Sequence, residues 1–367
     1  MTSKHHIAVP ALDPGGYTIH IGSDLLTSLL DRVSAQFPNA QPFIVTDKGL
    51  VEAGQLSRLR GGRNVDHFVI TPAGEISKTM QTVTAILESM EAAFLGRDSV
   101  VIALGGGTVG DIAGFAAALF KRGVPVVQVP TTLLAQADSA LGGKTGVDSS
   151  LSKNAFGAFW HPAAVYIDVQ TLETVSDRDY RAGLIESVKH AMIADADYFA
   201  YLESHLDAIL RREHDVLAEV ALKNCRIKGH VVQVDPTERN MRRILNYGHT
   251  IGHAVETASE FELLHGEAIA IGLVGAGLIE VELGFGDSER LDRVRGLLKR
   301  IGVPVTLPRG IRPDRLIDLI RRDKKAVDRW PRFVLIDNFG QIHKQGKEYA
   351  VDVGKATIET VLARLYG

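Results

Sequence analysis

The apolar run at residues 99–104, together with the glycines that follow it, constrains the fold more than any other part of the chain. A continuous apolar segment of this length is typical of a central strand in a parallel sheet. Gly105-Gly-Gly-Thr-Val-Gly110 comes next and fits G-x-G-x-x-G at the start of an expected helix. Such glycines let the backbone approach a pyrophosphate, and the helix N-terminus supplies N–H groups. A plain tight turn is the alternative, but the consecutive glycines before Asp111 favour nucleotide binding.

The acidic residue that usually holds the ribose is absent from its expected place. A standard dinucleotide fold has an Asp or Glu about 20 positions after the glycines. Residues 112–137 contain neither, and Thr131 and Thr132 occupy that neighbourhood. The acidic group could instead come from the end of an earlier strand, where Asp47 is the natural candidate.

Strand and helix patterns alternate in the first half of the chain. Short apolar or alternating runs predict strands, and runs with a period near 3.6 predict helices. Strands are expected at 17–21, 42–46, 65–70, 99–104, 124–129 and 164–168, and helices at 24–34, 78–93 and 111–120. This alternation predicts an α/β fold, Rossmann-like, with a mostly parallel sheet.

Helical periodicity dominates after about residue 172. Helices are expected at 181–193, 202–210, 216–234, 242–257, 267–283, 288–301 and 313–321, with short strands at 332–336 and 342–344. A chain of 367 residues is also too long for one ordinary core. We therefore expect an α/β domain over residues 1–172 and a mainly α-helical domain over residues 173–367.

Composition excludes several classes of protein. The hydrophobic content is 45%, the charged content 23% and the net charge −3, as in ordinary globular proteins, and no Lys/Arg block suits nucleic acid. No apolar run approaches the roughly 20 residues of a membrane span, and the N-terminus lacks the apolar core of a signal peptide. The single cysteine, Cys225, suits a reducing compartment. These features predict a cytoplasmic enzyme that binds neither membrane nor nucleic acid.

Histidines gather in Asn246-Tyr-Gly-His-Thr-Ile-Gly-His253 and in Leu264-His-Gly-Glu267. His249 and His253 are four apart, so a helix places them on one face, where imidazoles commonly hold Zn²⁺. Two histidines that merely pack in a helix interface are the alternative. The presence of His265 and Glu267 nearby favours a metal, and the spacing alone leaves the other ligands open.

A second polar segment is rich in glycine. The run from Thr131 to Asp148 and the residues just after it carry Asp138, Lys144, Lys153 and Asn154 among small residues. Such a segment is either solvent-exposed or recognises an anion. Gly-Gly-Lys-Thr at 142–145 is similar to part of a P-loop, but the leading glycine would fall at Asp138, which excludes a P-loop kinase or ATPase.

Together these motifs resemble the 3-dehydroquinate synthase family of sugar phosphate cyclases. The resemblance rests on residues 105–111, 130–136, 138–144, 153–154 and 246–253, which keep the family's order and spacing over nearly the whole chain. It implies a Rossmann-like N-terminal domain followed by an α-helical domain. Ser149–Ser152 and Glu186-Ser-Val-Lys-His190 depart from the commoner family residues without changing the expected ligands.

The resemblance also implies two cofactors, NAD and a divalent metal, Zn²⁺ or Co²⁺. The metal ligands it implies are Glu186, His249 and His265. It moves His253 away from the metal and onto the substrate phosphate. The residues it implies for NAD are Asp47, Glu75, Lys78, Gly106, Gly107, Asp111, Thr131, Thr132 and Thr174.

The implied substrate is a seven-carbon sugar acid phosphate, which needs separate sites for its carboxylate and its phosphate. Lys228 and Arg242 are expected to bind the carboxylate. The residues expected around the phosphate are Lys144, Asn154, Asn246, His253, one of Lys324 and Lys325, and Arg122 from a partner subunit of a homodimer. Asp138 completes the implied substrate-binding set. The implied catalytic residues are Lys153, Lys189, Glu238, Asn246 and His253, of which Lys153 and Lys189 would orient the reacting hydroxyls.

The implied reaction converts 3-deoxy-D-arabino-heptulosonate 7-phosphate to 3-dehydroquinate and phosphate. NAD is reduced and reoxidised within each turnover, phosphate leaves by β-elimination, and an aldol closure forms the ring. Sister cyclases that make amino-dehydroquinate, 2-epi-5-epi-valiolone or 2-deoxy-scyllo-inosose are alternatives. The latter two act on substrates without a carboxylate, which do not need both Lys228 and Arg242. A metal-dependent polyol dehydrogenase of related fold is a more distant alternative.

Overall fold

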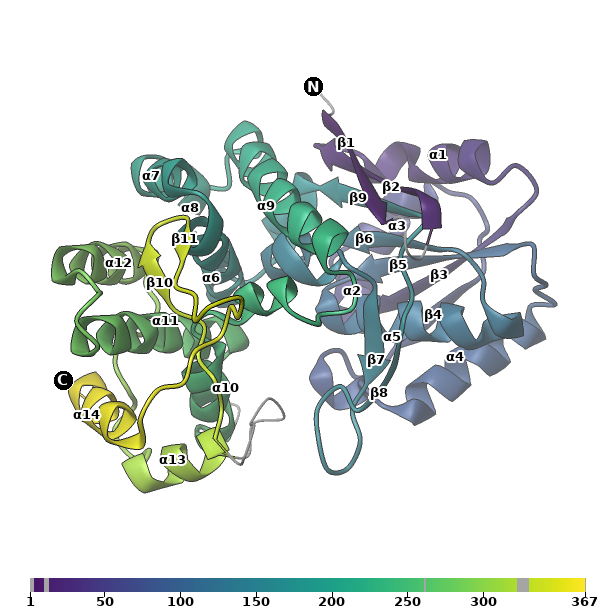
Figure 1. Ribbon diagram of the computed structural model, residues 1–367. Helices are drawn as coiled ribbons and strands as arrows, with labels where there is room; N and C mark the ends of the chain where they lie inside the picture. The colour runs from purple at the N-terminus through teal and green to yellow at the C-terminus, as the bar shows by residue number, and fades with distance from the viewer. Residues whose placement is uncertain (1–2, 10–12, 261, 322–329, 367) are drawn as a thin grey trace. The chain divides into compact units, whose positions relative to one another are not determined.

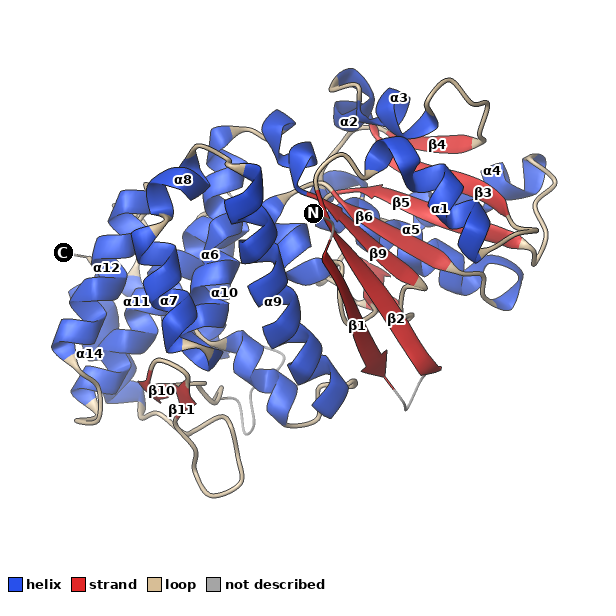
Figure 2. Ribbon diagram, turned by 90° about the horizontal axis from the view of Figure 1, so that it is seen from above, coloured by secondary structure: helices blue, strands red, loops and turns tan. Residues whose placement is uncertain are grey.

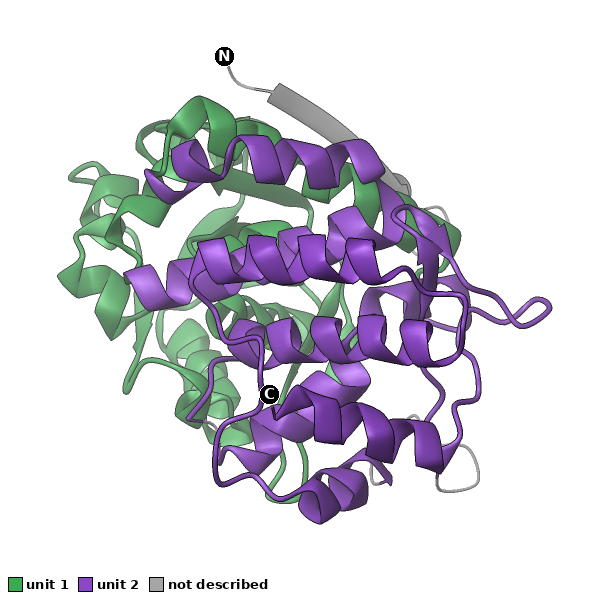
Figure 3. Cartoon of the chain, turned by 90° about the vertical axis from the view of Figure 1, so that its left-hand side faces the viewer, with its two compact units in different colours: residues 1–176, 212–236 green, residues 177–211, 237–367 purple. Residues whose placement is uncertain are grey.

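The computed structural model describes residues 3–9, 13–260, 262–321 and 330–366. The chain forms two compact units, shown in different colours in Figure 3. Unit 1 comprises residues 1–176 and 212–236, and unit 2 comprises residues 177–211 and 237–367. These units differ from the expected division of the chain at residue 172, because the segment 212–236 packs with unit 1. The assignment of nucleotide binding to residues 1–172 and of metal and substrate binding to residues 173–367 stays a prediction.

Unit 1 is built on a twisted sheet (Figures 1 and 2). Within the described residues its strands lie in the order β1-β2-β9-β6-β5-β3-β4. β1 and β2 pair antiparallel and every other neighbouring pair is parallel. The strand bounds are β1 Ser3–Val9, β2 Asp13–Gly22, β3 Gln41–Asp47, β4 His67–Ile70, β5 Ser99–Gly105, β6 Val126–Pro130 and β9 Ala164–Asp168. The prediction of a Rossmann-like, mostly parallel sheet is confirmed.

Helices cover both faces of this sheet. On one face, α4 (Met80–Ala92) and α5 (Gly107–Leu119) form a core with side chains such as Val101. On the other face, α1 (Leu29–Gln36) and α3 (Gln55–Arg60) form a core with side chains such as Ile102. Because successive residues of β5 enter opposite cores, the whole strand is buried, which explains its continuous apolar sequence.

Short elements complete unit 1, and some were not predicted. β7 (Lys144–Val147) and β8 (Phe156–Phe159) form an antiparallel hairpin in the glycine-rich segment, where periodicity is weak. The remaining elements are α2 Lys48–Glu52, the π-helix η4 Ala135–Ser139, the 3₁₀ helices η1 Leu26–Ser28, η2 Glu75–Ser77, η3 Phe120–Arg122 and η5 Val169–Thr174, and the returning helix α9 His214–Val234.

Unit 2 is mainly helical. Its helices are α6 Asp177–Ala194, α7 Ala196–Ser204, α8 Leu206–Leu210, η6 Met241–Asn246, α10 His249–Ala258, α11 His265–Glu282, α12 Ser288–Ile301, α13 Pro313–Arg321 and α14 Lys355–Leu365, and its short strands are β10 Ile336–Asn338 and β11 Gln341–Ile342. The mainly α-helical character is confirmed. The strand predicted at 332–336 lies further along the chain, and α14 was not predicted. None of the helices in the described part of the chain has the length and apolar composition that a membrane span requires.

The single helix predicted at 242–257 is wrong. η6 ends at Asn246 and α10 begins at His249, because Gly248 between them has a left-handed backbone with φ of 76°. α11 comes so close to this turn that a Cβ atom on Gly272 would lie 2.1 Å from the Gly248 carbonyl oxygen. Glycine at 272 therefore lets α10 and α11 pack backbone to backbone, and each of these helices begins with a histidine.

We expect Gly272→Ala to lower the free energy of unfolding by about 1–3 kcal/mol, since a methyl group cannot enter the contact unless the helices separate. Denaturant unfolding followed by circular dichroism measures the change. Gly296→Ala, in α12, is the matched control because its Cβ would meet open space, and it should be neutral or stabilising by up to about 1 kcal/mol. Equal effects of the two substitutions would contradict the close contact.

Candidate active site

The carboxyl ends of the parallel strands in unit 1 carry many of the predicted nucleotide-binding residues. Asp47 ends β3, Gly106 and Gly107 follow β5, and Thr131 and Thr132 follow β6. Gly106 is the N-cap of α5 and provides no side-chain cap, so the first N–H groups of that helix are available to an anion. In open α/β sheets, ligands bind at this edge.

Beside this edge, Lys78 joins a group of charged side chains. Its ammonium lies 2.7 Å from an Asp111 carboxylate oxygen and 3.8 Å from Glu75. Glu75 also accepts a hydrogen bond from Thr108 and lies 3.9 Å from the Lys153 ammonium. Burial lowers the pKa of Lys78, but the two carboxylates outweigh this effect and the net pKa is raised. The structure therefore brings together four residues that the sequence placed at cofactor and substrate sites.

The other predicted residues of unit 1 lie around the π-helix and the hairpin. Buried Lys228, on α9, lies 2.8 Å from a carboxylate oxygen of Asp138. Lys144 begins β7 and is exposed, and Asn154 lies in the exposed loop after it with a φ of 51°. Thr174 accepts a hydrogen bond from Gln55, and Arg122 is exposed on η3. Lys228 belongs to unit 1 and Arg242 to unit 2, so their joint role stays a prediction.

In unit 2, three helices place the predicted metal ligands together. Glu186 lies in the middle of α6, His249 is the first residue of α10, and His265 is the first residue of α11. The Oε1 atom of Glu186 lies 3.7 Å from Nε2 of His249 and 3.7 Å from Nε2 of His265. One ligand atom from each residue lies within 4.8 Å of the other two. A carboxylate and two imidazoles at this separation fit Zn²⁺ or a similar ion.

Neighbouring groups orient all three of these side chains. Nδ1 of His249 lies 3.1 Å from the Tyr247 carbonyl oxygen, and Nδ1 of His265 lies 3.1 Å from Oε2 of Glu256. Because Nδ1 faces an acceptor in both rings, it carries the proton when the ring is neutral, and Nε2, on the side of Glu186, is the nitrogen that can bind a metal. Lys189 donates to the other oxygen of Glu186, one turn along α6. The donor atoms are thus directed inward, as a metal requires.

The two histidines have opposite electrostatic environments. Burial and the Lys189 ammonium hold the pKa of His249 well below its usual value, despite the Glu186 carboxylate. Burial also lowers the pKa of His265, but hydrogen bonds and charge from Glu186 and Glu256 more than offset it and raise that pKa to about 9. The electrostatic potential at His265 is therefore more negative than that at His249.

Most of the remaining predicted residues of unit 2 lie close to His249 in the chain. Asn246 donates from Nδ2 to Glu238, at 3.1 Å, and the His253 ring centroid lies 5.1 Å from that of His249. Arg242 is almost completely buried, at 1% exposure. Lys324 and Lys325, predicted at the phosphate, lie outside the described residues.

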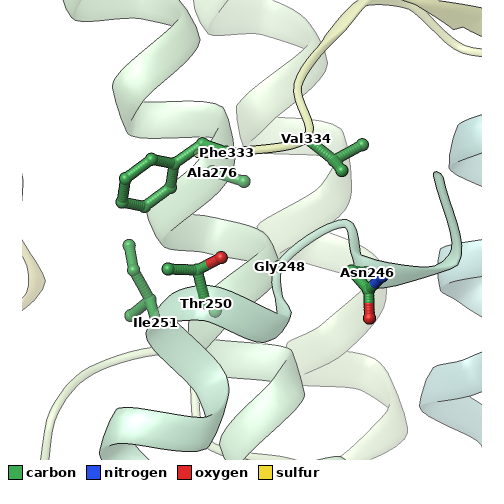
Figure 4. Close-up of a pocket in the computed structure, with 8 residues that line it drawn as sticks. Asn246, Gly248, Thr250, Ile251, Ala276, Phe333 and Val334 are labelled. Atoms are coloured by element: carbon green, nitrogen blue, oxygen red, sulfur yellow. The ribbon is translucent and has the colours of Figure 1, made fainter. Parts of the chain in front are cut away.

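A small pocket lies beside the Gly248 turn (Figure 4). Its lining residues are Asn246, Gly248, Thr250, Ile251, Gly272, Ala276, Phe333 and Val334. Phe333 and Ile251 lie at one end of it, and Asn246 lies at the other. Most of these side chains are apolar, so the pocket suits neither a phosphate nor a metal.

Sequence reasoning missed Glu256, which contacts His265. A signal was present, because His249, His253 and Glu256 are spaced at i, i+4 and i+7 and share one face of α10. It also missed Arg178, which forms a two-bond ion pair with Glu267 at 2.7 and 2.8 Å. Glu267, first considered beside the metal, caps α11 by accepting from the Leu264 amide.

The Glu267 carboxylate, which caps α11, predicts that the stability of the protein depends on pH. Burial raises the pKa of Glu267, but Arg178 and the Leu264 amide outweigh it, so the net pKa lies below 4.5. A depressed folded-state pKa stabilises the fold above the unfolded-state value, and the stabilisation is lost as the pH falls through the folded-state value. We expect Glu267→Gln to lower the free energy of unfolding by about 1 kcal/mol at pH 7, and by less below pH about 4. Urea unfolding at both pH values tests this; a pH-independent difference would contradict it.

Comparisons with known proteins agree with this fold and site. The family profile described as 3-dehydroquinate synthase N-terminal matches residues 68–182, and the profile described as 3-dehydroquinate synthase C-terminal matches residues 183–326. The curated 3-dehydroquinate synthase of Ruminiclostridium cellulolyticum is 47% identical over 281 residues, which cover 77% of this chain and 78% of that protein.

Solved structures of sugar phosphate cyclases are also similar. The 2-epi-5-epi-valiolone synthase of Streptomyces hygroscopicus, with NAD⁺ and Zn²⁺ bound, aligns with a TM-score of 0.85 and 28% identity over 96% of this chain and 98% of that one. A 2-deoxy-scyllo-inosose synthase complexed with carbaglucose-6-phosphate, NAD⁺ and Co²⁺ aligns with a TM-score of 0.85 and 25% identity over 99% of both chains. The architecture is therefore that of the sugar phosphate cyclases. Within that class, the two profile matches and the sequence identity show that the chain belongs to the 3-dehydroquinate synthase family.

Proposed function

We propose that the protein is a 3-dehydroquinate synthase, which converts 3-deoxy-D-arabino-heptulosonate 7-phosphate to 3-dehydroquinate and phosphate. The observation that carries the proposal is the cluster of Glu186, His249 and His265, which brings one carboxylate and two imidazoles together in a member of this family. Three protein ligands leave coordination positions for substrate oxygens, as catalytic metal sites do.

The same reasoning supports two cofactors. The similar cyclase structures hold NAD⁺ with Zn²⁺ or with Co²⁺. In this chain the strand ends and the Lys78–Asp111 pair of unit 1 would hold NAD, and the Glu186 cluster of unit 2 would hold the metal. When bound, NAD supplies reversible hydride transfer and the metal supplies Lewis-acid polarisation of a substrate hydroxyl.

The side chains around these sites have distinct proposed tasks. Lys189, buried against Glu186, would hold a substrate hydroxyl by hydrogen bonding and favour its loss of a proton. Lys153, which is partly exposed, would orient a second hydroxyl. Glu238 holds the Asn246 amide at 3.1 Å and would keep it directed at substrate.

The substrate's two anionic groups call for separate cations. Buried Lys228 and Arg242 would bind the carboxylate. Lys144, Asn154, Asn246 and His253 would bind the phosphate, with Asp138 fixing Lys228. Sister cyclases that use sugar phosphates without a carboxylate do not need the Lys228 and Arg242 pair, which favours the sugar acid phosphate as substrate.

We further propose that the protein acts as a homodimer, with Arg122 of one subunit completing the phosphate site of the other. Arg122 is exposed and held by a turn with left-handed backbone at both Lys121 and Arg122. Sedimentation of the purified protein tests the dimer. Mixing an Arg122→Ala chain with a Glu186→Gln chain, each inactive alone, should restore part of the activity if the sites are shared.

Phosphate release tests the proposed activity. With NAD⁺ and Zn²⁺, the protein should release phosphate from 3-deoxy-D-arabino-heptulosonate 7-phosphate without net formation of NADH. Turnover of sedoheptulose 7-phosphate or glucose 6-phosphate alone would assign a sister activity. Stoichiometric NADH from a polyol would indicate a dehydrogenase instead.

A further inference from the structure

The His265 imidazole lies between two carboxylates with different tasks. Its Nε2 faces Oε1 of Glu186 at 3.7 Å, and its Nδ1 lies 3.1 Å from Oε2 of Glu256. Glu256 comes from α10, one helix away from His265 at the start of α11. The imidazole is therefore held on both sides, by residues of two other helices.

Nδ1 of His249 faces a backbone oxygen and not a carboxylate among the described residues. That atom faces the Tyr247 carbonyl oxygen, which belongs to its own backbone turn. The His249 ring is thus oriented by the local fold of the chain. The His265 ring is oriented by a side chain, and one substitution can remove that orientation without touching the backbone.

Glu256 is well placed for this task. Its residue exposure is 8%, and α10 packs against α11 through the Gly248–Gly272 contact, which fixes the distance between the two helices. A buried carboxylate that accepts from Nδ1–H fixes the tautomer and increases the electron density on Nε2. Both effects strengthen Nε2 as a metal ligand.

We propose that Glu256 is a positioning residue that sets the metal affinity of the site through the Nδ1–H of His265. This inference rests on the proposed metal site at Glu186, His249 and His265. In this arrangement Glu256 does not itself bind the metal.

A competing arrangement exists. His253, Glu256 and His265 also place ligand atoms within 4.8 Å of one another. If the ion lay there, Glu256 would be a direct ligand and His253 would be another. The proposal and this rival differ in what replacing His253 does to the affinity.

The test measures Co²⁺ and Zn²⁺ dissociation constants of the full chain after chelation, by competition with a chromophoric chelator. We expect Glu256→Gln to weaken metal binding about 10-fold and Glu256→Ala up to about 100-fold. Thermal unfolding of the metal-free variants should match the wild type, and saturating metal should restore most of the turnover. The control is Glu260→Gln, an exposed carboxylate just beyond the same helix, which should leave the affinity unchanged.

Each result decides the proposal. Equal dissociation constants for the wild type and Glu256→Gln would overturn the role of Glu256 while leaving the metal site intact. A loss of affinity in His253→Ala as large as that in Glu256→Gln would make Glu256 a ligand and overturn positioning. A wild type that binds no stoichiometric ion would overturn the proposed metal site and this inference with it.

Discussion

Glu186→Gln is expected to remove bound metal and to reduce turnover by at least about 10³-fold, because Lewis-acid stabilisation contributes several kcal/mol to such reactions. The substitution keeps the shape of the side chain but removes the negative charge that faces both imidazoles at 3.7 Å. Metal content by atomic emission after gel filtration, together with phosphate release, measures both effects.

The control for Glu186→Gln is Asp179→Asn, an exposed carboxylate in the first turn of the same helix, which should keep metal and turnover. Because Lys189 is buried against Glu186, circular dichroism must first show that the variant is folded. A folded Glu186→Gln protein with unchanged metal content would remove Glu186 from the ligand set.

Local pattern was enough to predict the parallel sheet. β5 lies between two cores and has an apolar side chain at almost every position, so its sequence carries a strong signal. The glycine run after it also predicted a helix at this sheet edge, although α5 begins at Gly107 and the predicted helix began at residue 111. The β7–β8 hairpin escaped prediction because its glycines and small residues have no clear period.

The metal cluster could not be predicted from local sequence pattern alone. The spacing of His249 and His253 suggests a pair of ligands, yet His249 shares its cluster with Glu186 and His265 from two other helices. Only the family resemblance joined these three, since no spacing rule links α6 to α10 and α11. The break at Gly248 was missed for a related reason. It depends on contact with Gly272, which is distant in the chain.

A buried ion pair in unit 2 predicts the largest effect on stability. Arg290, on α12, lies 2.7 Å from a Glu280 oxygen on α11, and both side chains are at most 6% exposed. Glu280 also accepts from the Ile336 amide at 2.9 Å, and Arg290 donates to the Asp337 carbonyl, so the pair joins both helices to β10. Removing one partner leaves a buried charge uncompensated.

We therefore expect Arg290→Met to lower the free energy of unfolding by about 3–5 kcal/mol, measured by urea unfolding at pH 7. The double variant Glu280→Gln/Arg290→Met should recover most of this loss, because no buried charge remains. Arg295→Met, on the same helix and paired with exposed Asp292 at 3.8 Å, is the matched control and should cost less than about 1 kcal/mol. Equal losses for Arg290→Met and Arg295→Met would show that the buried pair contributes no more than an exposed one. A double variant as unstable as Arg290→Met would show that packing, not charge, explains the loss.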